Sequence, residues 1–199
     1  LYITCKVQSN FTPIFARPME ERTLLTNKAL NYTLDRLAFE VYEQHVDFSN
    51  LALISIQPRG LPLGKRIVEK LSALVPDQKI LHGALDVTFY RDDFRRREEV
   101  LVPSATDLDF SIEGKEIILI DDVLFTGRTV RSAMDALLDY GRPKNVELLT
   151  LIDRRFSREL PVQPDYTGRI VDVVKAERVK VEWTDDDSNN RVILFSSDQ

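Results

Sequence analysis

The stretch from residue 117 to residue 131, which reads IILIDDVLFTGRTVR, constrains the fold of this chain more than any other segment. Its leading apolar run, residues 117–120, indicates a strand that is buried on both faces. Asp121 and Asp122 follow at the carboxyl end of that strand, and a turn at residues 126–129 opens a helix. Ligands of open α/β sheets bind outside the carboxyl ends of the strands, and N–H groups at a helix start bind phosphate. This order of elements predicts a site for a phosphorylated sugar.

Each part of this stretch also has a plainer interpretation. Two adjacent acids after a strand are more often a solvated loop than a ligand site, and Thr-Gly-Arg-Thr is compatible with a simple turn and helix cap. The complete order of strand, paired acids, turn and helix is far more specific than its parts. The helix is predicted to bury one side, formed by Val130, Ala133, Met134, Leu137 and Leu138.

Hydrophobic periodicity predicts further strands and helices along the chain. Helices are expected over residues 27–46 and 60–74, and strands over residues 51–56, 87–90, 146–152, 170–174, 179–183 and 192–195. Residues 91–113 show no clear period, and a segment of that length in a compact domain is typically a functional lid or a disordered loop. The alternation of strands and helices predicts an α/β fold with a doubly wound, mostly parallel sheet.

Length and composition limit the classes of protein that fit. A chain of 199 residues, 43% of them hydrophobic, is long enough for one compact domain with a substantial core. The net charge of −5 argues against a general binder of polyanions. Cys5 is the only cysteine, which excludes an intrachain disulfide, and two histidines leave no Cys/His zinc spacing; a reducing, cytoplasmic location is the simplest expectation. No apolar run approaches the roughly 20 residues that cross a bilayer.

The beginning of the chain differs from the rest. It starts with Leu1 rather than Met, it is short of a secretory signal, and clear patterning begins only near Met19. Our hypothesis is that the native protein starts at Met19, and that residues 1–18 are an N-terminal extension, either translated upstream sequence or a poorly ordered arm. Residues 19–199 are expected to form a single domain. The polar run at residues 185–190 is expected to be a turn between two strands rather than a metal site.

The stretch at residues 117–131 resembles the phosphoribosyl pyrophosphate (PRPP) motif of type I phosphoribosyltransferases. The chain is most similar to the PyrR family, whose members regulate pyrimidine operons and are also uracil phosphoribosyltransferases. The similarity covers most of the chain from about Leu24 onward, and its matching elements are IQPRG at 56–60, DVTFYRDD at 86–93, GRP at 141–143, DR at 153–154, RELP at 158–161 and DYTG at 165–168. The resemblance implies a type I phosphoribosyltransferase sheet with a small hood and a long lid loop.

The resemblance also implies a role for individual residues. Asp121 and Asp122 would hold the ribose hydroxyls, directly or through Mg²⁺. Arg59, after the strand at residues 51–56, and Arg91, on the lid, would contact the pyrophosphate leaving group. The residues expected to bind PRPP are Pro58, Arg59, Asp121, Asp122, Val123, Leu124, Phe125, Thr126, Gly127, Arg128 and Thr129. Arg59 alone is also compatible with a surface arginine at a strand end, and no residue is indicated as a general base.

Uracil is the base that the resemblance implies. Purine-using members of the superfamily usually carry an aspartate three residues after the second acid, whereas this chain has Phe125 there, as the uracil-using PyrR proteins have an aromatic residue. In that family the base lies under the hood, near the equivalents of Arg154 and Val179. The implied products are UMP and pyrophosphate, and the implied assembly is a homodimer or a higher homo-oligomer. A transferase for another base is the alternative.

Two departures from the family pattern concern the substrate loops. Pro58 replaces a threonine of the pyrophosphate loop, which removes a backbone donor and a hydroxyl but favours a cis bond. The segment after residue 153 is one residue longer than usual, so that Arg155 and Phe156 replace a glycine and a histidine. We expect pyrophosphate binding to be altered but not lost, and the backbone around Arg154 to differ.

A third departure concerns RNA. The Thr-Arg-x-x-His element of RNA-binding family members corresponds here to Asp35, Arg36 and Phe39. RNA affinity depends on cations that neutralise phosphate, so a carboxylate at such a position is unfavourable. RNA binding is therefore less expected than its absence, but Arg36 is retained and a basic groove could still form across a dimer. A regulator that binds RNA and uses the PRPP pocket as a nucleotide sensor, with little turnover, is the alternative function.

Overall fold

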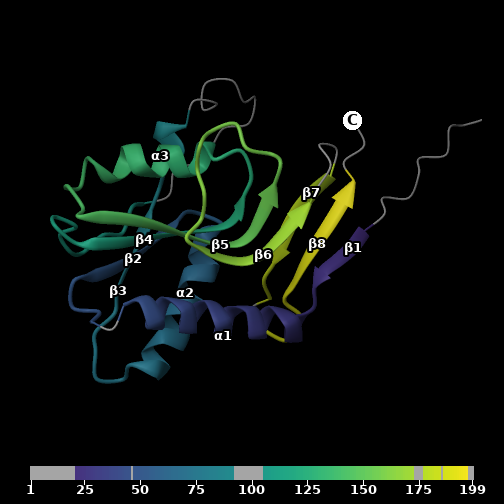
Figure 1. The fold of residues 1–199 in the computed structure, drawn as a ribbon, viewed down its shortest axis with the longest axis horizontal. Helices are drawn as coiled ribbons and strands as arrows, with labels where there is room; N and C mark the ends of the chain where they lie inside the picture. Colours follow the sequence, from purple (N-terminus) through teal and green to yellow (C-terminus); the bar gives the residue numbers. More distant parts are fainter. Residues whose placement is uncertain (1–20, 46, 92–104, 173–176, 185, 197–199) are drawn as a thin grey trace, which may run out of the picture.

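The computed structural model describes residues 21–45, 47–91, 105–172, 177–184 and 186–196. Its main body is a five-stranded parallel sheet in the spatial order β3-β2-β4-β5-β6 (Figure 1). The strands are β2 (Leu51–Ile56), β3 (Leu81–Leu85), β4 (Glu116–Leu124), β5 (Asn145–Arg155) and β6 (Tyr166–Asp172). The strand that carries the paired acids, β4, is therefore the central one.

Helices cover both faces of this sheet. They are α1 (Asn27–Gln44), α2 (Gly60–Leu74) and α3 (Arg128–Leu137). Ile118 and Ile120 of β4 join the core cluster that contains α1 and α2, whereas Ile117 and Leu119 join the cluster that contains α3. Alternate residues of a strand point to opposite faces, so β4 must be apolar at every position between its two helical layers. The predicted doubly wound α/β fold is confirmed.

A second, smaller sheet forms the hood. It is antiparallel, in the order β1-β8-β7, and consists of β1 (Glu21–Leu25), β7 (Glu177–Glu182) and β8 (Arg191–Ser196). Figure 1 shows it beyond β6, at one side of the main sheet. The turn between β7 and β8 is fixed to α2, because Arg66 forms an ion pair with Asp187 and its guanidinium lies 4.3 Å from the centre of the Trp183 ring. The predicted turn between two strands is confirmed over the described residues 186–190.

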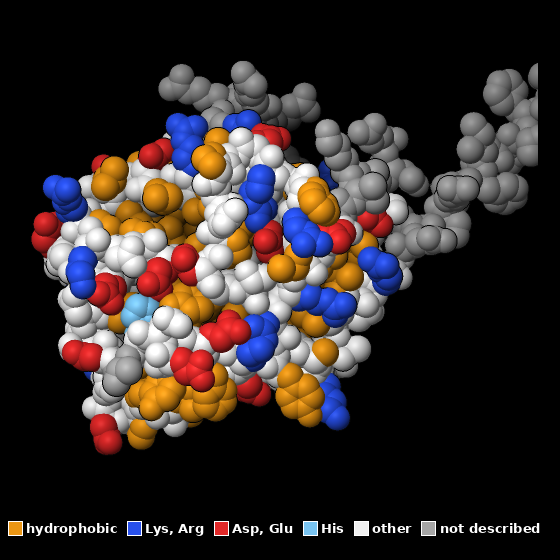
Figure 2. Space-filling view, viewed as in Figure 1, with side chains coloured by type: hydrophobic (Ala, Val, Ile, Leu, Met, Phe, Trp, Pro, Cys, Tyr) orange, Lys and Arg blue, Asp and Glu red, His pale blue; other side chains and the backbone are white. Residues whose placement is uncertain are grey.

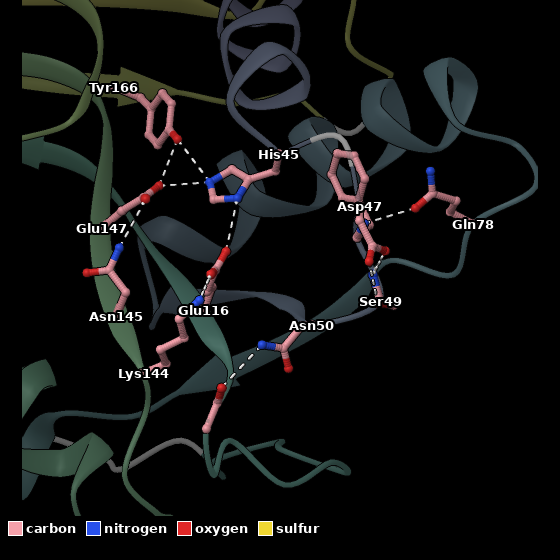
Figure 3. Close-up of polar contacts among 12 residues, drawn as sticks. His45, Asp47, Ser49, Asn50, Gln78, Glu116, Lys144, Asn145, Glu147 and Tyr166 are labelled. Atoms are coloured by element: carbon pink, nitrogen blue, oxygen red, sulfur yellow. Dashed lines mark hydrogen bonds and ion pairs between the residues drawn. The ribbon is translucent and has the colours of Figure 1, made fainter.

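A buried histidine joins the end of α1 to the amino ends of the central strands (Figure 3). One ring nitrogen of His45 lies 2.9 Å from the Glu147 carboxylate, and the other lies 3.5 Å from that of Glu116. The hydroxyl of Tyr166, the first residue of β6, donates to Glu147 at 2.7 Å. These contacts lie at the end of the sheet opposite to the paired acids, so their role is to hold the fold.

The predicted strand at residues 87–90 is wrong. The strand lies upstream, as β3, and Thr88–Tyr90 form a single 3₁₀ turn, η1. The carboxylate of Asp86 accepts hydrogen bonds from the amide and the hydroxyl of Thr88, at 2.8 and 2.6 Å. This side-chain turn overrides the β propensity of the residues that follow. β3 contains His82 and Gly83, which have low β propensity, so the sequence alone did not predict this strand. Its pairing with β2 determines that these residues form a strand.

Several predicted boundaries also move. The strand predicted at residues 117–120 extends to Leu124, so the paired acids lie inside β4 rather than after it. The strand predicted at residues 146–152 extends to Arg155. Met134 and Leu138, predicted to be buried, are 48% and 67% exposed. α3 ends at residue 137, and its buried stripe includes Ser132 and Ala136 instead.

Some predictions fall outside the described residues. These are the extension at residues 1–18, residues 92–104 of the lid, and positions 46, 173 and 174 at the ends of predicted elements. Within the described ranges, α1 ends at Gln44 and β6 begins at Tyr166, earlier than predicted, while β2 and α2 have their predicted bounds. In the same ranges, none of the helices has the length and apolar character needed to traverse a bilayer.

Candidate active site

The paired acids lie near the carboxyl end of β4. Their side chains are buried, since only 6% of Asp121 and 7% of Asp122 is exposed. The Asp122 amide donates to the Asp121 carboxylate at 3.1 Å, which fixes the position of the first acid relative to the strand. β4 pairs with β2 as far as Ile120 and with β5 beyond the acids, so the two carboxylates lie just past the β2 ladder on a strand that β5 still holds.

Burial raises the pKa of both acids. For Asp121, loss of hydration is the largest cause and the charge of Asp122 raises the pKa further, while the positive charges of Arg59 and Arg91 lower it. For Asp122, burial is again the largest cause and Arg59 opposes it. Two neighbouring buried carboxylates favour a bound proton until a cation or hydrogen-bond donors replace it. The pair is therefore suited to receive a metal ion or hydroxyl groups.

The loop between β2 and α2 lies beside these acids. It contains a cis peptide bond between Gln57 and Pro58, in agreement with the expectation from the proline, and Arg59 directly precedes α2. Gly60 starts the helix against β4, because a Cβ at this position would lie 2.3 Å from the carbonyl oxygen of Ile120. Only glycine permits so close an approach. The charge of Arg59 is thereby brought near enough to lower the pKa of both acids.

The turn at residues 126–129 leads from β4 into α3. Gly127 has a φ of 90°, in the left-handed region that favours glycine. It has no side chain with which to cap α3, so N–H groups at the helix start are available to an anion; the Arg128 amide donates to Thr126 Oγ1 at 3.4 Å. A cavity of about 270 Å³ adjoins the turn and is lined by Arg91, Asp121, Val123, Leu124, Phe125, Thr126, Gly127, Arg128, Thr129 and Val130.

Arg91 reaches this cavity from the foot of the predicted lid. Its guanidinium donates to Thr129 Oγ1 at 3.2 Å. The preceding turn, η1, is fixed to α3, because the Ser132 hydroxyl donates to the Tyr90 carbonyl at 3.2 Å. Arg91, which the sequence placed in a long aperiodic segment, is thus held beside the turn at residues 126–129 by an adjacent regular element.

Arg154, one of the two predicted base-binding residues, contacts the hood strand that carries the other, Val179. Arg154, near the end of β5, donates to the Glu177 carbonyl of β7 at 2.9 Å, and Val179 follows on the same strand. The Arg154 guanidinium lies 4.0 Å from the centre of the Phe125 ring. Arg154 and Val179 are buried, whereas Phe125 is 43% exposed. The chain therefore offers a partly exposed aromatic surface, supported by a buried cation. This surface lies next to the turn at residues 126–129, which is called the phosphate turn below after its predicted role.

Sequence reasoning assigned no role to the Arg-Glu-Leu-Pro element, yet it packs against the phosphate turn. The amides of Glu159 and Leu160 both donate to the Thr126 carbonyl, at 3.0 and 3.1 Å. The Glu159 carboxylate lies 2.7 Å from the guanidinium of Arg128. The residue types of this element are common in surface loops, so they gave no sign that it supports another loop. The resemblance itself was the only signal.

The residues present fit a magnesium ion that is shared with a substrate. Among the described residues, there is no group of three or more His, Cys, Asp or Glu side chains that could hold a metal ion. Mg²⁺ commonly takes one or two carboxylates from the protein and its remaining ligands from phosphates and water. Asp121 and Asp122 supply that number of carboxylates. They would therefore hold Mg²⁺ together with a bound diphosphate rather than alone.

Known proteins resemble this chain in sequence over most of its length. The chain matches the phosphoribosyl transferase domain family over residues 21–184. It is 42% identical to the bifunctional protein PyrR of Elusimicrobium minutum, over 88% of this chain and 97% of that protein. It is 44% identical to the PyrR protein of Acetivibrio thermocellus, over 88% of this chain and 95% of that protein.

Solved structures resemble this chain in fold. A hypoxanthine-guanine-xanthine phosphoribosyltransferase superposes with a TM-score of 0.62 at 19% identity, covering 88% of this chain and 94% of its own. A hypoxanthine phosphoribosyltransferase from Staphylococcus aureus gives a TM-score of 0.59 at 21% identity, covering 75% of this chain and 77% of its own. At these identities the likeness shows a common fold and nothing about the base.

Proposed function

Because the chain belongs to the phosphoribosyl transferase family, and within it to the PyrR proteins, we propose that it transfers the phosphoribosyl group of PRPP to uracil. The products are UMP and pyrophosphate. The observation that carries this proposal is the meeting of Asp121, Arg91 and the phosphate turn in one cavity at the carboxyl end of β4. An activated sugar phosphate needs an anion site, a hydroxyl site and a cation for its leaving group, and this cavity brings together residues suited to all three tasks.

The proposed reaction breaks the bond between C1 of the ribose and the pyrophosphate oxygen, and it forms a bond between C1 and N1 of uracil. The N1 proton is released. The start of α3 would hold the 5-phosphate, and Asp121 and Asp122 the ribose hydroxyls. Arg59 and Arg91 would stabilise the negative charge that develops on the leaving group. Bound Mg²⁺ would supply further neutralisation of the pyrophosphate charge.

Support for uracil comes from the surroundings of Phe125. This aromatic residue occupies the position at which purine-using enzymes usually carry an aspartate, and it is backed by Arg154. The Nε of Arg154 is buried and has no hydrogen-bond partner among the described residues. A donor in that state lowers its free energy by finding an acceptor, and a pyrimidine carbonyl oxygen is one.

The second candidate function is nucleotide-responsive regulation through RNA, as the word bifunctional in the names of the relatives suggests. Two observations argue against RNA binding through α1. Arg36 donates to the carbonyls of Thr167 and Gly168, and Asp35 forms an ion pair with Lys70, so neither cation is available without breaking a contact. On the face shown in Figure 2, Lys and Arg side chains of the described residues alternate with Asp and Glu rather than gather into one basic surface.

A panel of bases tests the proposed function. The protein is incubated with PRPP, Mg²⁺ and one of uracil, cytosine, hypoxanthine, guanine or adenine, and nucleotide formation is followed by chromatography. Uracil alone should give product. A purine nucleotide as the main product would refute the base assignment, and tight UMP binding without turnover would favour the regulator.

Two variants test the residue roles, and a gel shift tests RNA. Asp122→Asn and Arg59→Ala should each lower kcat/KM at least about 100-fold, because each removes a charge from the reacting end of the site. Near-wild-type rates would refute these assignments. A shift of pyrimidine-operon leader RNA that depends on UMP and weakens with salt would establish the regulatory function.

A further inference from the structure

The guanidinium of Arg158 is close to the two loops that meet at the base end of the cavity. Its Nη1 lies within hydrogen-bond distance of the carbonyl oxygens of Leu124, at 3.2 Å, of Phe125, and of Arg154, at 3.4 Å. The first two carbonyls lie where β4 ends and the phosphate turn begins. The third belongs to the residue that stacks on Phe125. One side chain therefore ties together both members of the aromatic–cation pair through their backbones.

The same side chain is itself held in place. Its Nε donates to the Val162 carbonyl at 3.0 Å, and its remaining nitrogen forms an ion pair with Asp153. Only 22% of the Arg158 side chain and 14% of the Asp153 side chain is exposed. A planar fork with five donors can satisfy several carbonyls at once, which a lysine ammonium on a flexible stem does less well. The contacts specify an arginine, not merely a positive charge.

The main chain that follows Arg158 completes this support. The Thr126 carbonyl receives the amides of Glu159 and Leu160, and a Cβ on Gly127 would lie 3.3 to 3.4 Å from side-chain atoms of Val162 and Leu160. Carbonyl oxygens from residues 124 to 126 are thus held by the segment that begins at Arg158. Residues 125 and 126 lie beyond the end of β4, where carbonyl groups have no ladder partner and take other donors.

We propose that Arg158 is a positioning residue for PRPP and for the base, acting through the backbone of residues 124–126 and of Arg154. It does not line the cavity and is not assigned any contact with the substrate. This inference rests on the proposed function, because it assigns a purpose to the shape of the phosphate turn. When Arg158 is lost, the turn no longer holds the anion-binding geometry at the start of α3, and Phe125 and Arg154 lose their common support.

The test compares three substitutions. Arg158→Met keeps an unbranched apolar stem and removes all donors, Arg158→Lys keeps the charge beside Asp153, and Arg155→Met is the matched control. Arg155 is an exposed arginine at the end of β5, where it forms an ion pair with Asp172 of β6 and stacks on Phe156. Steady-state rates with PRPP and uracil are measured alongside the dissociation constant for PRPP by calorimetry, and melting temperature and the emission of Trp183, the single tryptophan, report on folding.

A positioning role predicts a split between KM and kcat. Arg158→Met should raise the KM for PRPP and for uracil about 10-fold each, as expected for the loss of charged hydrogen bonds, while kcat at saturation changes less than about 3-fold. Arg158→Lys should recover less than half of that loss on a logarithmic scale. Arg155→Met should match the wild type in both constants.

Other outcomes overturn the inference. Full recovery by Arg158→Lys would mean that only the charge beside Asp153 matters. A fall in kcat with unchanged KM and unchanged PRPP affinity would mean that the variant merely contains less folded protein. If Arg158→Met does not fold, the KM values of Arg158→Lys are compared with those of the wild type instead, and unchanged values would overturn the inference. If the wild-type protein neither binds PRPP nor forms UMP, the proposed function fails. If the wild-type protein is active and the Arg158 variants have the same KM values, only the inference about Arg158 fails.

Discussion

The guanidinium of Arg154 lies 4.0 Å from the centre of the Phe125 ring, although Phe125 follows β4, Arg154 belongs to β5, and all of α3 separates them in the sequence. Phe125 follows the last residue of β4, and Arg154 is bonded to the hood through the Glu177 carbonyl. The pair therefore connects the phosphate turn to the hood. Cation–π contacts of this kind strengthen when the cation is shielded from water, as Arg154 is.

Loss of this stacking should weaken base binding selectively. We expect Phe125→Leu to raise the KM for uracil about 5-fold, as the energy of a shielded cation–π contact and of a stacked base implies, and to change the KM for PRPP less than about 2-fold. Phe125→Tyr should retain most of the affinity. The control is Phe156→Leu, because Phe156 is 80% exposed and, among the described residues, stacks on the neighbouring Arg155 alone. Equal effects of both leucine variants in steady-state kinetics would contradict the assignment.

The raised pKa of the paired acids predicts a stability change with a definite pH dependence. A carboxyl whose pKa is higher in the folded than in the unfolded state binds more protons when folded, so stability falls as pH rises above its ordinary value of 3.8. Asparagine cannot ionise. Asp121→Asn should therefore raise the melting temperature of the ligand-free protein at pH 7.

This gain should disappear as the pH falls to 3.8 and below, because the wild-type carboxyl is then protonated in both states. Thermal melts between pH 3.5 and pH 8 check the sign. Thr150→Ser, a conservative change at the strand-pairing partner of Asp121 on β5, is the control and should show no such pH dependence. A lower melting temperature for Asp121→Asn at pH 7 would show that the acid is stabilised by contacts that outweigh its burial.

Gly60 should tolerate no side chain. A Cβ there would lie 2.3 Å from the Ile120 carbonyl, so Gly60→Ala must push α2 away from β4. We expect a loss of about 1–3 kcal/mol in unfolding free energy, the usual cost of overpacking, together with a higher KM for PRPP because Arg59 moves with the helix. Gly114→Ala is the comparison, since nothing lies within 4 Å of its Cβ but its φ is 69°. It should cost about 1 kcal/mol and leave KM unchanged. Denaturant titration and kinetics measure both effects.

His45 should matter for folding and not for chemistry. His45→Ala removes the group between Glu116 and Glu147 and opens a buried polar site (Figure 3). We expect a loss of about 2–3 kcal/mol in unfolding free energy, with KM values unchanged. Asp47→Ala, an exposed position whose carboxylate accepts only from the nearby Ser49 among the described residues, should leave the melting temperature unaltered. A change in KM for His45→Ala would mean that the amino end of the sheet communicates with the cavity.

The sequence by itself determined those features that depend on near neighbours in the chain. Periodicity gave the bounds of β2 and α2 correctly, and the order of apolar run, Asp121, Asp122 and glycine turn indicated a phosphate and ribose site on the central strand. Such signals are local: a buried strand needs consecutive apolar residues, and a helix start that binds an anion needs a small residue before it.

The tertiary structure alone decided which distant residues support that site. β3 forms because β2 provides a partner for residues that have little β propensity. The residues after β3 form a turn because the Asp86 carboxylate accepts a hydrogen bond from the Thr88 amide. Arg158 contacts the carbonyls of residues 124, 125 and 154. The first two of these residues lie more than 30 positions away in the sequence. A carbonyl oxygen is the same at every position of the chain, so residue types cannot indicate which side chain will satisfy it; only the folded arrangement brings that donor within reach.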